Sequence, residues 1–194
     1  MSKTNFGLVN YAKAQLGNPY WWGTFGQYGT KDLYDLKKKQ YPESYFWPYD
    51  SSMDNKKVHD CSGLVKGYLM CENEYASPVY NPSFDMNAAG LYNFSKEKGH
   101  ISTMPKTPGI LVFYEGFGHV GIYIGNDQVI QAAGINSGVI QTTLSVDPHW
   151  GYWAKCPYVH YESIEQEPTE DVGELLADIK STLIELIAKI DKMA

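Results

Sequence analysis

The chain has 194 residues, of which 43% are apolar, so it is long enough for one domain with a substantial core and an appendage. All 16 basic residues are lysine, and this absence of arginine argues against nucleic-acid binding, because phosphate and guanine contacts favour the guanidinium group. The formal net charge of −6 belongs to residues 162–194, since residues 1–161 hold equal numbers of acids and lysines.

The cysteines and the start of the chain indicate the compartment. Cys61, Cys71 and Cys156 give an odd count and form neither a disulfide framework nor a closely spaced metal-ligand pair. The segment from Met1 to Gly17 lacks the long apolar region of a signal peptide, and no segment approaches the length of a transmembrane helix. We therefore expect a protein made in the reducing cytoplasm, with no membrane contact, no metal and no cofactor.

The first third of the chain predicts helices and an aromatic segment. Residues 3–16 place apolar side chains on one face of a helix. The aromatic run 20–23 that follows is either core or the wall of a groove. Residues 24–59 then predict a helix from Thr30, a candidate N-cap, to about Gln40. The rest of this segment is a loop rich in aromatics, which either bind a ligand or cover the core.

The second half of the chain changes from helix to strand. A third helix is predicted over 84–98, with Ser83 as its cap. From Thr107 onward the pattern consists of short β-branched and aromatic runs separated by turns, and these predict strands over 110–114, 120–124, 128–132 and 139–143, with one or two more within 150–161. Helices followed by an antiparallel sheet define an α+β fold.

The end of the chain predicts a separate helix. Residues 162–171 form an acidic linker that contains Pro168, after a first domain over 1–161. Within 172–194, apolar residues recur at alternating steps of four and three, as in a coiled coil, at Val172, Leu176, Ile179, Leu183, Leu186, Ile190 and Met193. This seam favours a homo-oligomer through residues 172–193, and packing of the helix back onto the first domain is the alternative.

Cys61 is the first candidate for chemistry. It stands among small and polar residues, and the apolar run that follows predicts a buried helix with Cys61 at its N-terminus. The positive end of the helix dipole favours a thiolate there and lowers the pKa of the thiol. Gly63 leaves room for a substrate or a neighbouring backbone. The alternative is a small buried cysteine that only packs the helix.

His119 and Gln131 supply the partners that a catalytic cysteine needs. His119 begins one predicted strand and Gln131 ends an apolar run on the next, so adjacent antiparallel strands can place both side chains on one face. Gly121 leaves space beside the imidazole. An amide oxygen that accepts from one ring nitrogen would turn the other toward the sulfur. Alone, each residue reads as an ordinary strand residue, but the order cysteine, histidine, polar residue is that of papain-like hydrolases.

Four motifs in order resemble one family. The chain is similar, over nearly all of residues 5–160, to the bacterial cell-wall cysteine peptidases that include NlpC. The matching stretches are 16–23 (LGNPYWWG), 60–65 (DCSGLV), 108–113 (PGILVF) and 118–125 (GHVGIYIG), the last followed by 129–132 (VIQA). The resemblance implies a papain-like fold in which helices pack on the antiparallel sheet.

The resemblance also implies roles for site residues. Cys61 would be the nucleophile, His119 the base and Gln131 the orienting residue, a position often held by histidine in the family. The expected substrate-binding residues are Tyr20, near the oxyanion, Asp60 and Ser62, at the amino end of the peptide, and the motif residues Trp22 and Gly118.

The implied activity is cleavage of peptidoglycan. The substrate would be the stem peptide, cut between D-glutamate and the diamino acid by a Cys61 thiolate paired with protonated His119. An amidase of the CHAP type, which would cut between N-acetylmuramic acid and L-alanine, is the enzymatic alternative, and a wall-binding module with an inactive site is the non-enzymatic one.

The 24–59 segment is an insertion relative to short family members and resembles that of phage-borne lysins. We therefore expect an endolysin that reaches the wall by a holin-like route. The insertion should border the groove and govern specificity, with Trp47 and Tyr49 close to Cys61.

Overall fold

The computed structural model describes residues 3–162 and 172–191. The chain divides into two compact units, Met1–Glu162 and Ser163–Ala194. Within the described part of the chain, no helix is long and apolar enough to cross a membrane.

The first unit is built on a six-stranded sheet in which all neighbours are antiparallel. Its strands, in spatial order, are β3 (Lys98–His100), β8 (Trp150–Ala154), β4 (Leu111–Tyr114), β5 (Val120–Gly125), β6 (Gln128–Gly134) and β7 (Gly138–Thr143). The four strands predicted after Thr107 are confirmed within two residues, and the segment 150–161 supplies one strand. The predicted α+β class is confirmed.

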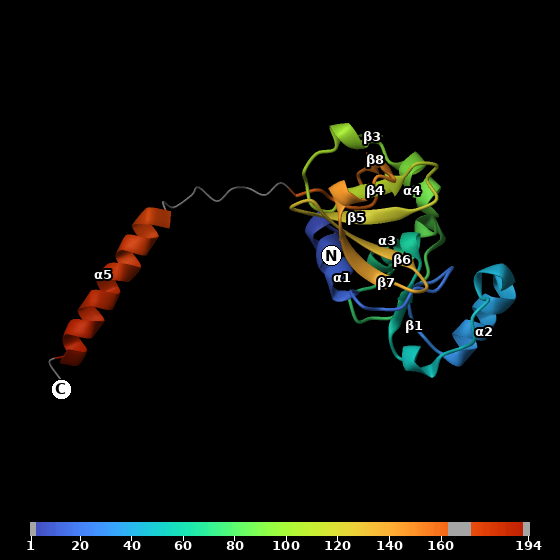
Figure 1. Ribbon diagram of the computed structural model, residues 1–194, viewed down its shortest axis with the longest axis horizontal. Helices are drawn as coiled ribbons and strands as arrows, with labels where there is room; N and C mark the ends of the chain where they lie inside the picture. Colours follow the sequence, from blue (N-terminus) through green and yellow to red (C-terminus); the bar gives the residue numbers. More distant parts are fainter. Residues whose placement is uncertain (1–2, 163–171, 192–194) are drawn as a thin grey trace. The chain divides into compact units, whose positions relative to one another are not determined.

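Two helices pack on one face of this sheet. α1 (Asn5–Ala14) begins after Thr4, whose hydroxyl accepts a hydrogen bond from the Gly7 N–H. α3 (Cys61–Met70) is buried along its whole length. Both helices contact β5 and β6 and each other, and Figure 1 shows them against the sheet. A buried apolar cluster fills this interface, and a second one, around Val112 and Val129, lies on the other face.

The helix predicted over 84–98 is wrong in both boundaries. α4 spans only Ala88–Phe94, because the Asn87 side chain accepts from the Gly90 N–H and begins the helix there. Residues Pro82–Phe84 form a separate 3₁₀ turn. Lys98, the last residue of the predicted helix, begins strand β3 instead, and β3 pairs with β8. Tertiary pairing overrides the local preference at this point.

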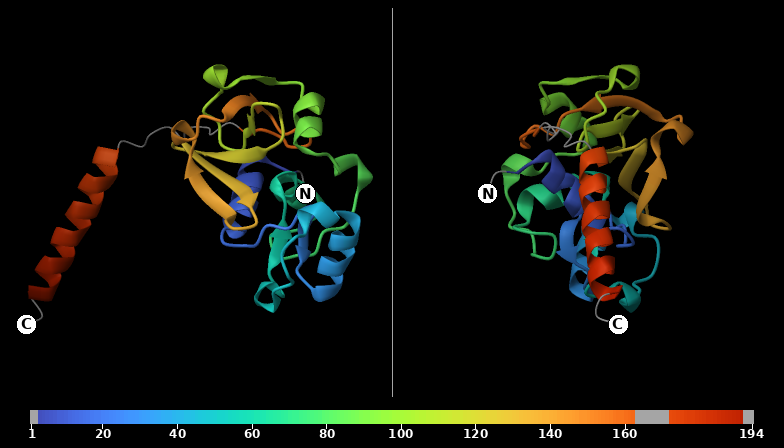
Figure 2. Two further views of the ribbon diagram at one scale, coloured as in Figure 1. Left: turned by 45° about the vertical axis from the view of Figure 1, so that its right-hand side comes forward. Right: turned by 90° about the vertical axis from the view of Figure 1, so that its left-hand side faces the viewer.

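The insertion forms a substructure with its own small core. β1 (Phe25–Tyr28) pairs antiparallel with β2 (Lys57–His59), which brings the two ends of the insertion together beside α3. α2 (Lys31–Gln40) begins at Thr30, as predicted. This core, called the aromatic cluster of the insertion, joins Trp21 from the preceding segment to Tyr34, Tyr45 and Val58, with Leu33, Trp47, Tyr49 and Met53 packed around them. α2 and β3 lie at opposite ends of the unit (Figures 1 and 2).

The second unit contains α5 (Val172–Asp191), a helix of 20 residues. Of the predicted seam, Leu176, Ile179, Leu183 and Ile190 are 55–62% exposed. Met193 and most of the predicted linker lie outside the described residues. The oligomer therefore stays a prediction.

Candidate active site

Asp60 places Cys61 at the N-terminus of α3. One carboxylate oxygen of Asp60 accepts from the Gly63 N–H at 2.5 Å and from the Ser62 hydroxyl at 3.0 Å. The other oxygen accepts from the Gly23 N–H at 2.9 Å. The cap therefore also ties the aromatic run 20–23 to the start of the helix. Cys61 follows as the first helical residue, as the sequence predicts.

Gly63 allows the insertion to approach this helix end. A Cβ added to Gly63 would overlap the carbonyl oxygen of Thr24. The same carbonyl oxygen accepts a hydrogen bond from the Asp60 N–H at 3.0 Å. The glycine thus serves the close approach of a neighbouring backbone, which is one of the two uses expected from the sequence.

His119 and Gln131 meet on the sheet. Their strands pair with Ile122 opposite Ile130, which places Gln131 opposite Gly121 and diagonal to His119. His119 Nε2 lies 2.6 Å from Gln131 Oε1, while Gln131 Nε2 donates to the Thr142 hydroxyl at 3.0 Å. Because the amide oxygen can only accept, the neutral imidazole carries its proton on Nε2. Nδ1 is then left with a free lone pair, as a general base requires.

The sulfur of Cys61 lies beside the same strand. Backbone N–H groups of Ser62, Val120 and Cys61 itself face the thiol, and Val120 directly follows His119. The start of β5 and the start of α3 therefore meet at the sulfur. This brings Cys61 and the His119–Gln131 pair, predicted from separate motifs, into one site.

The charge state of this site differs from the expectation. Burial, and then the nearby Asp60 carboxylate, raise the pKa of the Cys61 thiol to about 11, despite the backbone N–H groups that favour the thiolate. Burial also lowers the pKa of His119, against the opposing effects of Gln131, Asp147 and Asp60. The resting pair is therefore a neutral thiol and a neutral imidazole. The predicted lowering of the thiol pKa by the helix N-terminus is wrong because desolvation outweighs the dipole.

A groove of about 770 Å³ gives access to the thiol. Among the residues that line it are Cys61, Asp60 and Ser62, and also Trp22 and Gly118. Four of the five residues expected to bind substrate are therefore on its surface. Tyr20 is not in the lining; it forms a bridge with His59, two residues before Cys61, and packs against the buried cluster that contains Cys61.

The insertion borders this groove through different residues from those expected. α2 and the residue after it supply Leu33, Leu36, Lys37, Gln40 and Tyr41, and β1 supplies Phe25 and Gln27. Trp47 and Tyr49 are absent from the lining and pack in the aromatic cluster instead. The loop aromatics thus hold α2 in place, and α2 forms the wall.

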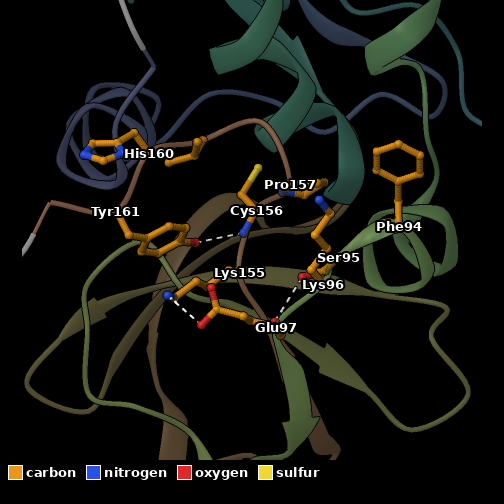
Figure 3. Close-up of a pocket in the computed structure, with 10 residues that line it drawn as sticks. Phe94, Ser95, Lys96, Glu97, Lys155, Cys156, Pro157, His160 and Tyr161 are labelled. Atoms are coloured by element: carbon orange, nitrogen blue, oxygen red, sulfur yellow. Dashed lines mark hydrogen bonds and ion pairs between the residues drawn. The ribbon is translucent and has the colours of Figure 1, made fainter.

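A second pocket of about 400 Å³ lies next to another cysteine (Figure 3). The Cys156 N–H donates to the Tyr161 hydroxyl at 2.8 Å, and Lys155 pairs with Glu97 at 2.8 Å. Burial raises the pKa of the Cys156 thiol to about 12. Among the described contacts, no imidazole held by an amide faces this thiol. The pocket therefore offers no counterpart of the His119–Gln131 pair.

Two supporting groups are missed by the sequence reasoning. Thr142 fixes the orientation of the Gln131 amide, and only the strand register, with Gln131 opposite Ile140, would have revealed it. The ring of Tyr114 packs against His119 at a tilt of 46°, with 4.7 Å between the ring centroids, and its hydroxyl donates to Asp147 at 2.6 Å. Asp147 in turn favours the protonated imidazole. No local motif marks either contact.

A cysteine at a helix N-terminus beside a strand-borne histidine and amide is the arrangement of papain-like cysteine hydrolases. The NlpC/P60 family model matches residues 43–158, which is more than half of the chain. The protein therefore belongs to the NlpC/P60 family, a family of peptidoglycan hydrolases.

Solved structures share this fold. The peptidoglycan hydrolase RipB from Mycobacterium tuberculosis is 21% identical with a TM-score of 0.50, and the match covers 81% of this chain and 65% of RipB. NlpC1 from Trichomonas vaginalis is 17% identical with a TM-score of 0.50, and the match covers 82% of this chain and 46% of NlpC1. This chain thus spans less than two thirds of either protein. No curated protein matches the chain.

Proposed function

We propose that this protein is a peptidoglycan endopeptidase that cleaves a stem-peptide amide, between D-γ-glutamate and the diamino acid, with Cys61 as nucleophile. The observation that carries the proposal is the contact between His119 Nε2 and Gln131 Oε1, which leaves Nδ1 free as a base beside the groove that Cys61 lines. Membership of the NlpC/P60 family supports peptidoglycan as the substrate. The proposed scissile bond comes from the resemblance of the motifs.

The neutral resting pair determines the order of proton transfer. His119 Nδ1 removes the thiol proton as the Cys61 sulfur attacks the amide carbonyl, so the ion pair forms together with the new C–S bond. The backbone N–H of Cys61 and the hydroxyl of Tyr20 are the donors for the oxyanion. One such donor contributes about 3–4 kcal/mol to the stability of the transition state.

The protonated imidazole then completes the reaction. It stays bound to Gln131 through Nε2, so the Nδ1 proton points at the leaving amine and is transferred as the C–N bond breaks. Water, deprotonated by the same Nδ1, hydrolyses the thioester and restores the thiol. Gln131 can only accept at Oε1, and Thr142 holds it in that orientation. The imidazole therefore keeps one geometry through both steps.

The test is digestion of defined peptidoglycan, followed by assignment of the fragments by mass. A new amino group on the diamino acid supports the proposal. Release of peptides with a free N-terminal L-alanine would show an amidase instead. Cys61→Ala is the control: its folded protein should release no fragments, and retained activity would contradict the proposed nucleophile.

We also propose that the enzyme is an endolysin that self-associates through α5. Four seam residues, Leu176, Ile179, Leu183 and Ile190, are exposed on this helix. A lone helix of 20 residues is marginal in water, and burial of the seam between copies would stabilise it. Several active sites on one particle would raise avidity for a polymeric wall. The resemblance of the 24–59 insertion to phage-borne lysins supports the endolysin role.

A further inference from the structure

The wall that α2 adds to the groove carries a cation. Lys37 lines the groove on the side of the insertion. Its ammonium lies over the ring of Tyr41, at 5.8 Å from the centroid. The Tyr41 ring packs against Gly23, whose N–H donates to Asp60, the residue before Cys61. A short chain of contacts thus ties Lys37 to the reacting end of the groove.

The other charges that line the groove already have partners. Lys66 on α3 forms an ion pair with Asp85 at 2.9 Å, and the second oxygen of Asp85 accepts from the Tyr80 hydroxyl. Asp60 accepts three hydrogen bonds from its own surroundings. Among the described residues, Lys37 has no carboxylate within ion-pair distance. It is the unpaired cation of this surface.

Partial burial makes an unpaired ammonium at Lys37 unfavourable. Burial lowers the pKa of the ammonium, with Asp60 and Asp85 acting in the opposite sense and Lys66 in the same one. An ammonium that has lost part of its hydration gains from a partner carboxylate. Asp60 and Asp85 favour the ammonium from a distance, but no carboxylate of the described residues lies within ion-pair distance of it. A ligand that brings its own carboxylate into the groove would supply this partner.

We propose that Lys37 binds a free carboxylate of the peptide next to the scissile amide, and that the enzyme thereby distinguishes this carboxylate from a carboxamide. The inference rests on the proposed function, because a peptide linked through the γ-carboxyl of D-glutamate keeps its α-carboxyl free or amidated. Lys37 is a specificity-determining residue and has no part in the transfer of protons. Lys37 lies in the insertion, outside the residues 43–158 that the family model matches.

The experiment uses two synthetic stem peptides that differ only at the D-glutamate α-position, one with a carboxylate and one with a carboxamide. The full-length wild type should cleave the carboxylate peptide with a kcat/KM about tenfold higher, the size of one charge-assisted hydrogen bond. Lys37→Gln should lose about tenfold on the carboxylate peptide and change little on the carboxamide peptide. Lys37→Arg should retain the preference.

Lys39→Gln is the matched control, because Lys39 is an exposed lysine of the same helix that does not line the groove. It should leave both rates unchanged. An equal loss on both peptides in Lys37→Gln, or no loss on either, would overturn the inference while leaving the proposed function intact. Failure of the wild type to cleave either peptide would overturn the proposed function and this inference together.

Discussion

The two walls of the groove are held in different ways. The wall that carries Cys61 and Gly118, the neighbour of His119, is backed by α3, β5 and β6, whose buried residues belong to the main core. The wall formed by α2 is backed by the aromatic cluster of the insertion, which is a separate small core. The proposed chemistry thus stands on the main core, and the proposed specificity on a separate small core.

This division has a physical reason. Proton transfer between sulfur and imidazole depends on short, directed contacts, which a densely packed helix end and strand can hold. Recognition of a peptide needs area and charge, which a surface helix can supply. The two walls meet closely where the Thr24 backbone crosses the start of α3 at Gly63.

The largest effect should come from changes in the wall backed by the main core, called the rigid wall below. His119→Ala should lower kcat by about 10²–10⁴-fold, because it removes the only proposed base. Gln131→Ala should cost about 10–100-fold, since it removes a hydrogen bond that strengthens as the imidazole becomes charged. Thr142→Val should cost only a few-fold, because the amide loses its anchor but keeps its oxygen. Single-turnover rates measure this series. Equal effects of the three changes would contradict the proposed chain of hydrogen bonds from Thr142 through Gln131 to His119.

The contact between Gly63 and Thr24, where the two walls meet, should be sensitive to a single added methyl group. Gly63→Ala would push its Cβ into the Thr24 carbonyl oxygen, and neither backbone can move freely, so we expect a destabilisation of about 1–3 kcal/mol or more. Gly118→Ala is the matched control for stability, because its added methyl meets no atom within 4 Å. Chemical denaturation measures both. A wild-type midpoint for Gly63→Ala would show that the insertion is not seated on α3.

The sequence predicts the wall that carries Cys61 better than the wall formed by α2. The strands beside His119 and Gln131 are short β-branched runs bounded by turns, and an apolar run follows Cys61, so local patterns suffice there. The thiol pKa is not predictable in this way, because the burial that raises it comes from residues far apart in the chain. Neither are the bounds of the helix predicted over 84–98, because its last residue, Lys98, begins β3 and pairs with the distant strand β8.

In the insertion, the sequence predicts the helix but not its use. The aromatics at 45–49 look like a ligand-binding loop because nothing local indicates what they cover. In the structure, Tyr45 stacks on Trp47 at 4.9 Å and both pack with Tyr34 of α2. An aromatic loop and a small core have the same composition, and only the tertiary contacts separate them.

The pH profile is a smaller and more specific test of the rigid wall. Because the pKa of His119 is lowered, the base becomes protonated, and kcat/KM falls, only below pH 6.5 as the solution is acidified. Because the pKa of Cys61 is raised to about 11, the thiol keeps its proton across the neutral range, so activity should persist until the pH approaches 11. The alkylation rate of Cys61 by iodoacetamide should rise over the same alkaline range. An alkaline limb well below pH 11 would indicate a resting ion pair instead.

The smallest effect on the chemistry itself should come from removing the second unit. A chain that ends at Glu162 keeps the whole groove, so its kcat/KM on a short synthetic peptide should equal that of the full chain. Its activity on intact walls should fall, because the avidity of linked active sites is lost. Light scattering should give an oligomeric mass for the full chain and a monomeric mass for the truncated one.

Leu183→Glu in the full chain is the point-mutant control: the residue is 59% exposed, so a charge there costs nothing in a monomer but should break a packed seam. A monomeric mass for the unmodified full chain as well would contradict the oligomer, and α5 would then serve the fold or another partner.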